Sequence, residues 1–500
     1  MNGNLFARLA EGFPADRGRV LLETEDGQEV SFAEVLDQAG RMVALLHASG
    51  VEPGDRVAVQ VEKSVANVCL YLAVLQAGAV YVPLNTAYTP AEVGYFLKDA
   101  EPKAVVCDPS AAAALSSLIG SERTWLFTLG ADGAGTLTAQ AARLPSERAA
   151  ARRQGSDLAA ILYTSGTTGR SKGAMLSNDN LWSNAAALHR LWGFGPGDVL
   201  IHALPLFHTH GLFVALNLML MNGGRLILLP RFGPEQVIGL MGRATVLMGV
   251  PTHYTRLLAS GSLTREAARG MRLFVSGSAP LLAATHREFE ARTGQRILER
   301  YGMTETGMNA SNPLEGDRRA GTVGQALPGV ELRVCDAEGR VLPAGEVGVL
   351  EVKGPNVFAG YWRMPERTAE EMRPDGFFVT GDLARIGADG YVTIVGRAKD
   401  LIISGGLNVY PKEVEAALDA LPGVVESAVI GVPHPDFGEA VVAVLAVSAD
   451  PGDVAARLRD RLAAFKLPKY VAVVESLPRN AMGKVQKNLL RDRFAGLFAG

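Results

Sequence analysis

One stretch of the chain reads Leu162-Tyr163-Thr164-Ser165-Gly166-Thr167-Thr168-Gly169-Arg170-Ser171-Lys172-Gly173, and the apolar run that precedes it from Leu158 predicts a buried strand. Glycines let backbone N–H groups approach a polyphosphate closely, and hydroxyl side chains add further donors. Lys172 supplies a mobile positive charge for the outer phosphates. We therefore expect a loop that binds a nucleoside triphosphate through Thr164, Ser165, Gly166, Thr167, Thr168, Gly169 and Lys172.

This loop differs from two common phosphate-binding patterns. Lys172 follows a serine, which departs from the Walker pattern, and the dinucleotide fingerprint G-x-G-x-x-G is missing. A surface linker rich in Ser, Thr and Gly is the alternative, but a buried strand and a lysine are not typical of one. The order Thr-Ser-Gly-Thr-Thr-Gly at 164–169 resembles the phosphate loop of the adenylate-forming family, which contains the acyl-CoA synthetases, the peptide-synthetase adenylation domains and the luciferases.

Length and composition indicate a globular protein with more than one domain. The 500 residues exceed what one hydrophobic core holds, and 48% of them are apolar. A net charge of −3 without a basic cluster argues against nucleic acid as a partner. Three distant cysteines indicate reduced thiols, and no apolar stretch reaches the ~18 residues of a membrane helix. We expect a cytoplasmic protein with no membrane partner.

Apolar strands alternate with amphipathic helices along most of the chain. Strands are expected at 56–60 and 104–107 with a helix at 65–77 between them, whereas residues 111–155 have weak periodicity and are expected to form connecting surface structure. Short strands at 345–353 and 376–395 suggest a small β-barrel-like subdomain. The predicted fold is α/β: a large N-terminal domain of two α/β subdomains plus the β-barrel-like one, joined by a hinge to a small α+β C-terminal domain.

A second motif reads Glu299-Arg300-Tyr301-Gly302-Met303-Thr304-Glu305. Tyr301 can stack on a purine, Thr304 can donate to an α-phosphate, and Glu305 offers the oxygen ligand that Mg²⁺ prefers. The turn Ser276-Gly277-Ser278-Ala279-Pro280 resembles the adenine-contacting turn of the family. The resemblance implies that Ser278, Ala279 and Glu299 contribute to the nucleotide site.

Two further segments match motifs of the family. Phe378-Val379-Thr380-Gly381-Asp382-Leu383 resembles the motif whose aspartate holds the ribose hydroxyls, a role that suits an acceptor-only carboxylate. The resemblance gives Arg397 a ribose and phosphate contact. It also places His208 against the acyl group, for which a hydrogen-bonded interior histidine is the alternative. His202 and His210 receive no role.

The C-terminal part carries the third strong motif, in which Lys484 matches the adenylation lysine of the family. Lys399 lies where the family hinges, so we expect domains at 1–396 and 397–500. Gly405 and Gly406 would let the pantetheine arm of coenzyme A approach the backbone. The resemblance implies ATP, Mg²⁺ and coenzyme A as participants, with a rotation about Lys399 between the two half-reactions. A lysine acetyltransferase acting on Lys484 would remove its charge.

Residues 205–212, 249–256 and 276–281 are similar to malonyl-CoA synthetases. A buried second carboxylate must be paired, and Arg256, ahead of Arg287, is the candidate; solvated helix charges are the alternative for both. We therefore predict an ATP-dependent malonyl-CoA synthetase that also takes methylmalonate. A CoA ligase for a short-chain or aryl monocarboxylic acid is the second hypothesis. A non-catalytic nucleotide-binding regulator is the third.

Overall fold

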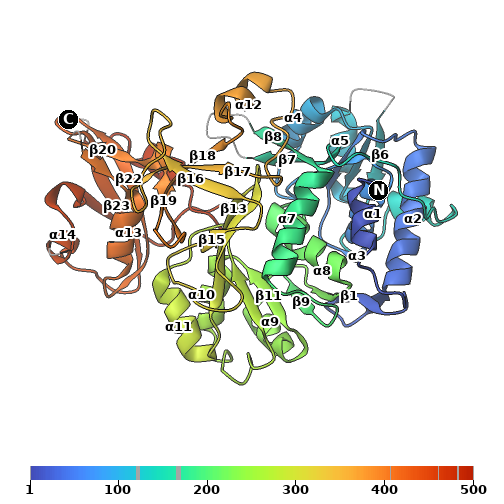
Figure 1. The fold of residues 1–500 in the computed structure, drawn as a ribbon, viewed down its shortest axis with the longest axis horizontal. Helices are drawn as coiled ribbons and strands as arrows, with labels where there is room; N and C mark the ends of the chain where they lie inside the picture. The colour runs from blue at the N-terminus through green and yellow to red at the C-terminus, as the bar shows by residue number, and fades with distance from the viewer. Residues whose placement is uncertain are drawn as a thin grey trace.

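Four β-sheets organise the part of the chain that the computed structural model describes, which is residues 2–119, 124–164, 171–405, 407–459, 461–480 and 483–498. Three sheets belong to a large N-terminal part, and the fourth forms the core of a small C-terminal part, orange to red at the left of Figure 1. The predicted α/β fold with a large and a small domain is confirmed.

The first sheet ends at the expected phosphate loop. Its strands, in the spatial order β6-β5-β3-β4-β7-β8, are β3 (Arg56–Gln60), β4 (Val80–Pro83), β5 (Ala104–Cys107), β6 (Trp125–Thr128), β7 (Leu158–Thr164) and β8 (Lys172–Ser177). The central strands β4 and β5 are buried throughout, as parallel strands covered on both faces are. Only β7 and β8 pair antiparallel, which sets Thr164 opposite Lys172. Ser165, Gly166, Thr167, Thr168 and Gly169 lie outside the described residues.

The second sheet brings several expected site residues to one edge. Its order is β15-β14-β13-β12-β11-β9-β10-β1-β2, with β1 (Val20–Thr24), β2 (Glu29–Ser31), β9 (Val199–His202), β10 (Arg225–Leu228), β11 (Val246–Gly249), β12 (Leu273–Ser276), β13 (Ile297–Met303), β14 (Gly307–Ser311) and β15 (Gln325–Ala326). The strands from β1 to β13 along this order are parallel, so their carboxyl ends meet at one edge. Ligands of open α/β sheets bind at that edge.

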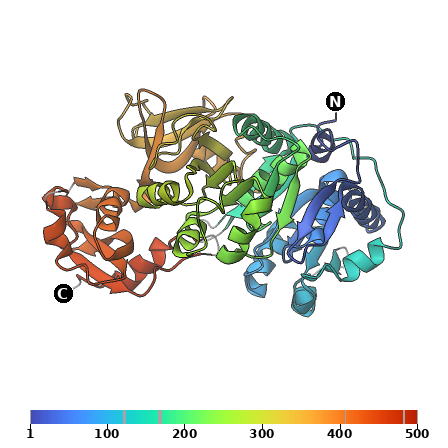
Figure 2. The same cartoon turned by 90° about the horizontal axis from the view of Figure 1, so that it is seen from below.

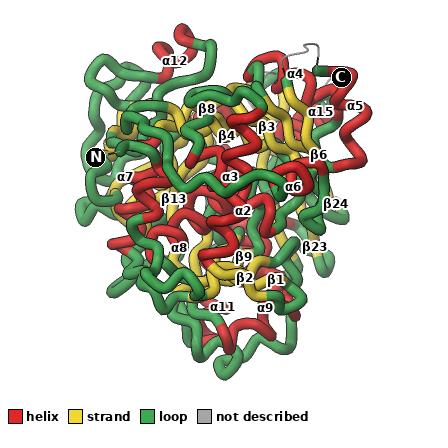
Figure 3. The backbone as a smooth tube through the Cα atoms, turned by 90° about the vertical axis from the view of Figure 1, so that its right-hand side faces the viewer, coloured by secondary structure: helices red, strands yellow, loops and turns green. Residues whose placement is uncertain are grey.

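Helices cover both sheets. The N-terminal part contains α1 (Leu5–Ala10), α2 (Phe32–Ala48), α3 (Val65–Gln76), α4 (Pro90–Ala100), α5 (Ala112–Leu118), α6 (Thr136–Ala141), α7 (Asn178–Leu191), α8 (Asn217–Asn222), α9 (Pro234–Leu240), α10 (Pro251–Ala259) and α11 (Ala283–Thr293). Figure 3 shows α2 and α3 lying over the strands. None of the helices within the described ranges has the length and apolar character needed to cross a bilayer.

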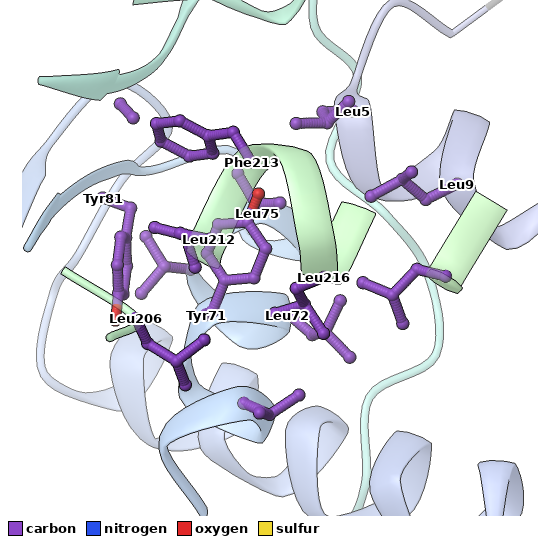
Figure 4. Packing of buried hydrophobic residues seen from close by; sticks show 14 of the residues in the cluster. Leu5, Leu9, Tyr71, Leu72, Leu75, Tyr81, Leu206, Leu212, Phe213 and Leu216 are labelled. Atoms are coloured by element: carbon purple, nitrogen blue, oxygen red, sulfur yellow. The ribbon is translucent and has the colours of Figure 1, made fainter. Parts of the chain in front are cut away.

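The largest core lies around α3, which is buried on every side because it is apolar around its whole circumference. Tyr71 of α3 packs edge-on against Tyr81 (Figure 4). Its hydroxyl donates to Asn217 Oδ1 at 3.0 Å. Leu212 and Leu216 of a π-helical segment, His210–Leu216, pack into the same core. A π-helical turn often marks a functional site, and this one begins at the histidine segment.

The expected β-rich subdomain is a four-stranded antiparallel sheet of β16 (Glu331–Cys335), β17 (Gly348–Lys353), β18 (Phe378–Ile386) and β19 (Val392–Arg397), with α12 (Pro365–Glu371) beside it. The small domain, which Figure 2 shows from below, contains β20 (Ile402–Ser404), β21 (Leu407–Val409), β22 (Val424–His434), β23 (Gly438–Val447), β24 (Tyr470–Val474), α13 (Pro411–Asp419), α14 (Val454–Leu458) and α15 (Lys487–Phe494). A 3₁₀ turn, Ala398–Asp400, connects the two.

Candidate active site

Asp382 is the centre of the expected ribose site, and two neighbours hold its carboxylate. β18 and β19 pair so that Asp382 lies opposite Arg397, whose Nε is 2.7 Å from Asp382 Oδ1. The Tyr301 hydroxyl donates to Oδ2. The structure therefore brings these three residues together into a buried acceptor group that is suited to hydroxyl donors.

The turn that follows β12 has an unusual backbone. Ser278 has a φ of +70°, which costs energy for a residue with a side chain and is typical of functional sites. Gly277 lets the Arg300 guanidinium approach the backbone closely, because a Cβ there would lie 2.3 Å from Cζ of Arg300 and would displace that side chain. Because this turn directly follows β12, Ser278 and the half-buried Ala279 lie at the carboxyl edge of the sheet, as expected for an adenine-contacting turn.

Glu299 lies beside this turn because it pairs with Ser276 across β12 and β13. Its Oε1 accepts from the Leu281 N–H at 3.1 Å, whereas Oε2 is buried without a partner in the described part of the chain. Burial raises the pKa of Glu299 to about 8, and the Leu281 N–H and Lys412 oppose that shift only partly. The folded protein therefore holds this carboxyl protonated below about pH 8.

This raised pKa predicts a pH-dependent stability effect of Glu299→Gln. The native state binds a proton that the unfolded chain releases above its ordinary pKa of 4.5, so the wild type loses stability as pH rises from there to about 8. Glutamine has no such loss. In thermal denaturation at pH 5, 7 and 9, the variant should gain on the wild type with rising pH, by on the order of a few kcal/mol in total.

Glu288→Gln, which alters an exposed glutamate on α11, is the control for this comparison. A difference between Glu299→Gln and wild type that stays constant over the three pH values would contradict the protonated state of Glu299.

Glu305 is a buried carboxylate in the turn after β13, where Thr304 precedes it. Its Oε1 lies 3.1 Å from the Tyr361 hydroxyl. Burial raises the pKa of Glu305, while the positive charges of Lys172 and Arg397 lower it. Since a divalent cation would stabilise the ionised form, this carboxylate fits the expected Mg²⁺ ligand.

Lys172 lies close to Glu305 but is held by other groups. Its Nζ is 3.1 Å from Glu371 Oε1 and 4.0 Å from the centre of the Tyr361 ring. Thr164, opposite Lys172 in the β7–β8 hairpin, donates from Oγ1 to the Lys172 carbonyl at 3.4 Å. The two described members of the expected phosphate loop are therefore adjacent.

Of the two histidines after β9, His210 is buried and His208 is half-buried, and both are neutral at pH 7. His208 Nδ1 and His210 Nε2 have no partner among the described residues, and His210 Nδ1 lies 3.3 Å from Ser278 Oγ. Burial, together with the positive charges of Arg300 and Lys484, lowers the pKa of His208 to about 4. The open Nδ1 argues against a hydrogen-bonded interior histidine and favours the predicted contact with a substrate. His202 is structural, because its Nε2 bonds the Gly211 carbonyl at 2.8 Å.

Arg300 is a functional candidate that the sequence reasoning missed. Only 3% of the residue is exposed, yet Nε and Nη2 have no hydrogen-bond partner and no carboxylate pairs with it within the described ranges. Burial lowers the pKa of Arg300 to about 9, which leaves the group cationic at neutral pH. A buried cation without a counter-ion is costly, so it indicates a site for an anionic ligand.

The two arginines expected to bind a distal carboxylate are both exposed. Arg256 lies 5.1 Å from the centre of the Phe232 ring, and that ring stacks on His253. Arg287 lies on the outer face of α11. Neither is enclosed as Arg300 is, so their predicted role stays a prediction.

Lys484 reaches this site from the small domain. Its N–H donates to Asn480 Oδ1 at 3.0 Å, and a Cβ on Gly483 would lie 3.3 Å from Thr252 Oγ1 at the start of α10. Lys484 is exposed as a whole residue, yet the protein around its ammonium and the nearby Arg397 lower its pKa, while Asp382 raises it. The side chain therefore lies near the ribose-site pair and His208.

The expected thioester-step loop is not part of this cluster. Gly405 has a φ of +59° and donates to the Phe437 carbonyl at 2.8 Å, and its neighbours Ile403 and Leu407 are about half exposed, at 52% and 49%. Gly406 lies outside the described residues. Lys399 is exposed in the 3₁₀ turn between the domains.

Comparisons with known proteins match both the large and the small part of the chain. Residues 6–362 match the model of the AMP-binding enzyme family, and residues 413–484 match the AMP-binding enzyme C-terminal domain. The crystal structure of ATP-bound MatB from Rhodopseudomonas palustris is 57% identical, with a TM-score of 0.97 over 100% of both chains. The mitochondrial malonate–CoA ligase ACSF3 of Mus musculus is 36% identical over 87% of this chain and 81% of its own. The sulfoacetate–CoA ligase of Cupriavidus necator is 35% identical over 93% of each.

Proposed function

The chain belongs to the AMP-binding enzyme family, and from that premise we propose that it is an ATP-dependent malonyl-CoA synthetase. The reaction would join malonate to coenzyme A through a malonyl-adenylate, releasing pyrophosphate and then AMP. Methylmalonate, which carries the same two carboxylates, is a further expected substrate.

The observation that carries the choice of acid is Arg300. It is a buried guanidinium without a counter-ion, beside Gly277 of the adenine turn and close enough to His208 to lower the pKa of that imidazole. A dicarboxylate brings the charge that this site lacks, whereas a monocarboxylate spends its only carboxylate on the phosphorus of ATP. A malonate–CoA ligase and a sulfoacetate–CoA ligase, whose acid also has two negative groups, are both among the relatives.

Adenylation requires two anions to meet, and the chain offers fixed cations for that step. Asp382 and Arg397 would hold the ribose, Lys172 would bind the outer phosphates, and His208 would lie against the acyl group. Lys484 would bridge the reacting carboxylate and the α-phosphate. Such pre-arranged charges lower the barrier without a covalent intermediate on the protein. Mg²⁺ bound by Glu305 would neutralise phosphate charge.

The thioester step would use a second domain arrangement. We infer that the unit 397–500 rotates about Lys399, which withdraws Lys484 and brings Gly405 and Gly406 to the adenylate. Hinges are typically a few residues in a linker, and Lys399 lies in the short turn between β19 and β20. Acetylation of Lys484 remains a prediction, because removing its charge would block the first step only.

The acid is tested by measuring AMP release with coenzyme A for malonate, methylmalonate, sulfoacetate, acetate, butyrate and benzoate. We expect kcat/KM for malonate to exceed that for acetate by roughly a hundredfold or more, since a paired buried charge contributes ~3–5 kcal/mol. A preference for a monocarboxylate would favour the second hypothesis. ATP binding without acid-dependent turnover of any acid would favour a nucleotide-binding regulator.

A further inference from the structure

Helix α12 ends at Glu371, whose carboxylate contacts two cationic side chains, Lys172 and Arg367, and the hydroxyl group of Tyr361. Lys172 Nζ lies 3.1 Å and Arg367 Nη2 lies 2.5 Å from Glu371 Oε1, and the Tyr361 hydroxyl lies 2.6 Å from Oε2. The Lys172 ammonium also rests over the Tyr361 ring. The side chains of Lys172 and Glu371 are only 14% and 18% exposed, so solvent screens this pair incompletely.

Within α12, Arg367 lies one turn before Glu371 and pairs with it, but the helix dipole opposes a glutamate at this end. A negative charge at the last residue of a helix interacts unfavourably with the helix dipole. Strand β8 holds the segment that precedes α12, because the Ala359 N–H donates to the Met175 carbonyl at 2.9 Å and the Trp362 N–H donates to the Gly173 carbonyl at 2.7 Å. The strand that begins with Lys172 therefore also positions the segment that leads into α12.

We propose that Glu371 is a counter-ion that holds Lys172 before the nucleotide binds, and that the outer phosphates of ATP must take the lysine from it. This inference rests on the proposed function, in which Lys172 serves those phosphates. An ammonium has three donors, and here Glu371 takes one while the Tyr361 ring covers another side. Glu371 is thus a positioning residue that lowers the affinity for triphosphate and pyrophosphate. After adenylation, re-formation of the Lys172–Glu371 ion pair favours the release of pyrophosphate.

The test compares Glu371→Gln with wild type by calorimetric binding of three probes: ATP, inorganic pyrophosphate and AMP. We expect the Kd for ATP and for pyrophosphate to fall roughly two- to fivefold, the size typical of one partly exposed ion pair that no longer competes. AMP, which lacks the outer phosphates, should bind with an unchanged Kd. Glu370→Gln is the matched control, because Glu370 pairs with Arg367 and has no ion pair with Lys172 in the described part of the chain, and its side chain is 63% exposed.

A double-mutant cycle with Lys172→Ala decides whether the effect passes through the lysine. The increase in ATP and pyrophosphate affinity caused by Glu371→Gln should largely vanish when Lys172 is alanine. An increase of full size in that background would mean that Glu371 repels the phosphates directly, and it would overturn the proposal that the phosphates take Lys172 from Glu371. Weaker ATP binding in Glu371→Gln, or an equal change for AMP, would also overturn it. Glu371→Asp, which keeps the charge but draws the carboxylate back, should change the Kd values less and in the same direction. A wild type that binds no ATP would refute the proposed function itself.

Discussion

Replacement of Lys484 by alanine should abolish acid-dependent adenylate formation, with a loss of at least ~10²–10³ in rate, the usual cost of removing one pre-arranged charge from a transition state. The lysine belongs to the small domain, yet it lies near Arg397, Asp382 and His208 in this arrangement of the domains. Thioester formation from a supplied acyl-adenylate should be nearly unchanged. The measurement is pyrophosphate release for the first step and thioester yield for the second.

Arg493→Ala is the control for this prediction, because Arg493 is an exposed cation on α15 of the same small domain. It should leave both half-reactions unaltered. If Lys484→Ala slows the two half-reactions equally, the lysine acts in both steps. That result would contradict the proposal that a rotation about Lys399 withdraws Lys484 before the thioester step.

The ribose site could be predicted from sequence because its partners lie in one hairpin. Asp389-Gly390 predicts the turn. Strand pairing continued outward from that turn without a shift would set Asp382 opposite Gly396, one residue short of Arg397. A β-bulge between Leu383 and Ala384 supplies the shift that sets these two directly opposite each other. The ion pair between Asp382 and Arg397 was therefore not predicted, although motif resemblance gave both residues a role at the ribose.

Arg300 shows what pattern reasoning left out. It follows Ile297, Leu298 and Glu299 in a strand whose first four residues are all buried, and Glu299 and Arg300 point to opposite faces and cannot pair with each other. Two adjacent charges inside an apolar strand were therefore the available signal. Whether a partner for Arg300 lay elsewhere depended on contacts across the sheet, which no local pattern contains.

Other contacts depend on segments that are distant along the chain. Lys172 and Glu371 are 199 positions apart in the sequence. They come together where residues 359–362 pair with β8. Strand β6 was missed within 111–155 because it is an edge strand of four residues, begins with the half-exposed Trp125 and therefore has no buried run.

The malonate assignment makes its strongest prediction at Arg300. Arg300→Met leaves the distal carboxylate of malonate without a partner in a buried site, and breaking a buried ion pair typically costs ~3–5 kcal/mol. Malonate kcat/KM should therefore fall by roughly a hundredfold to several thousandfold, while acetate and butyrate should lose little. The measurement is AMP release for the three acids.

Stability separates this outcome from simple damage to the fold. Arg300 is a buried cation without a counter-ion among the described residues, so replacing it by methionine should leave the melting temperature unchanged or raise it, as expected where function retains an unfavourable charge. Arg256→Met is the matched comparison, because an exposed arginine should shift every acid equally and by less than ~1 kcal/mol. If Arg256→Met removes malonate turnover selectively and Arg300→Met does not, the distal carboxylate is held by the exposed arginine. A fall in melting temperature together with a uniform loss for all acids would make Arg300 a structural residue.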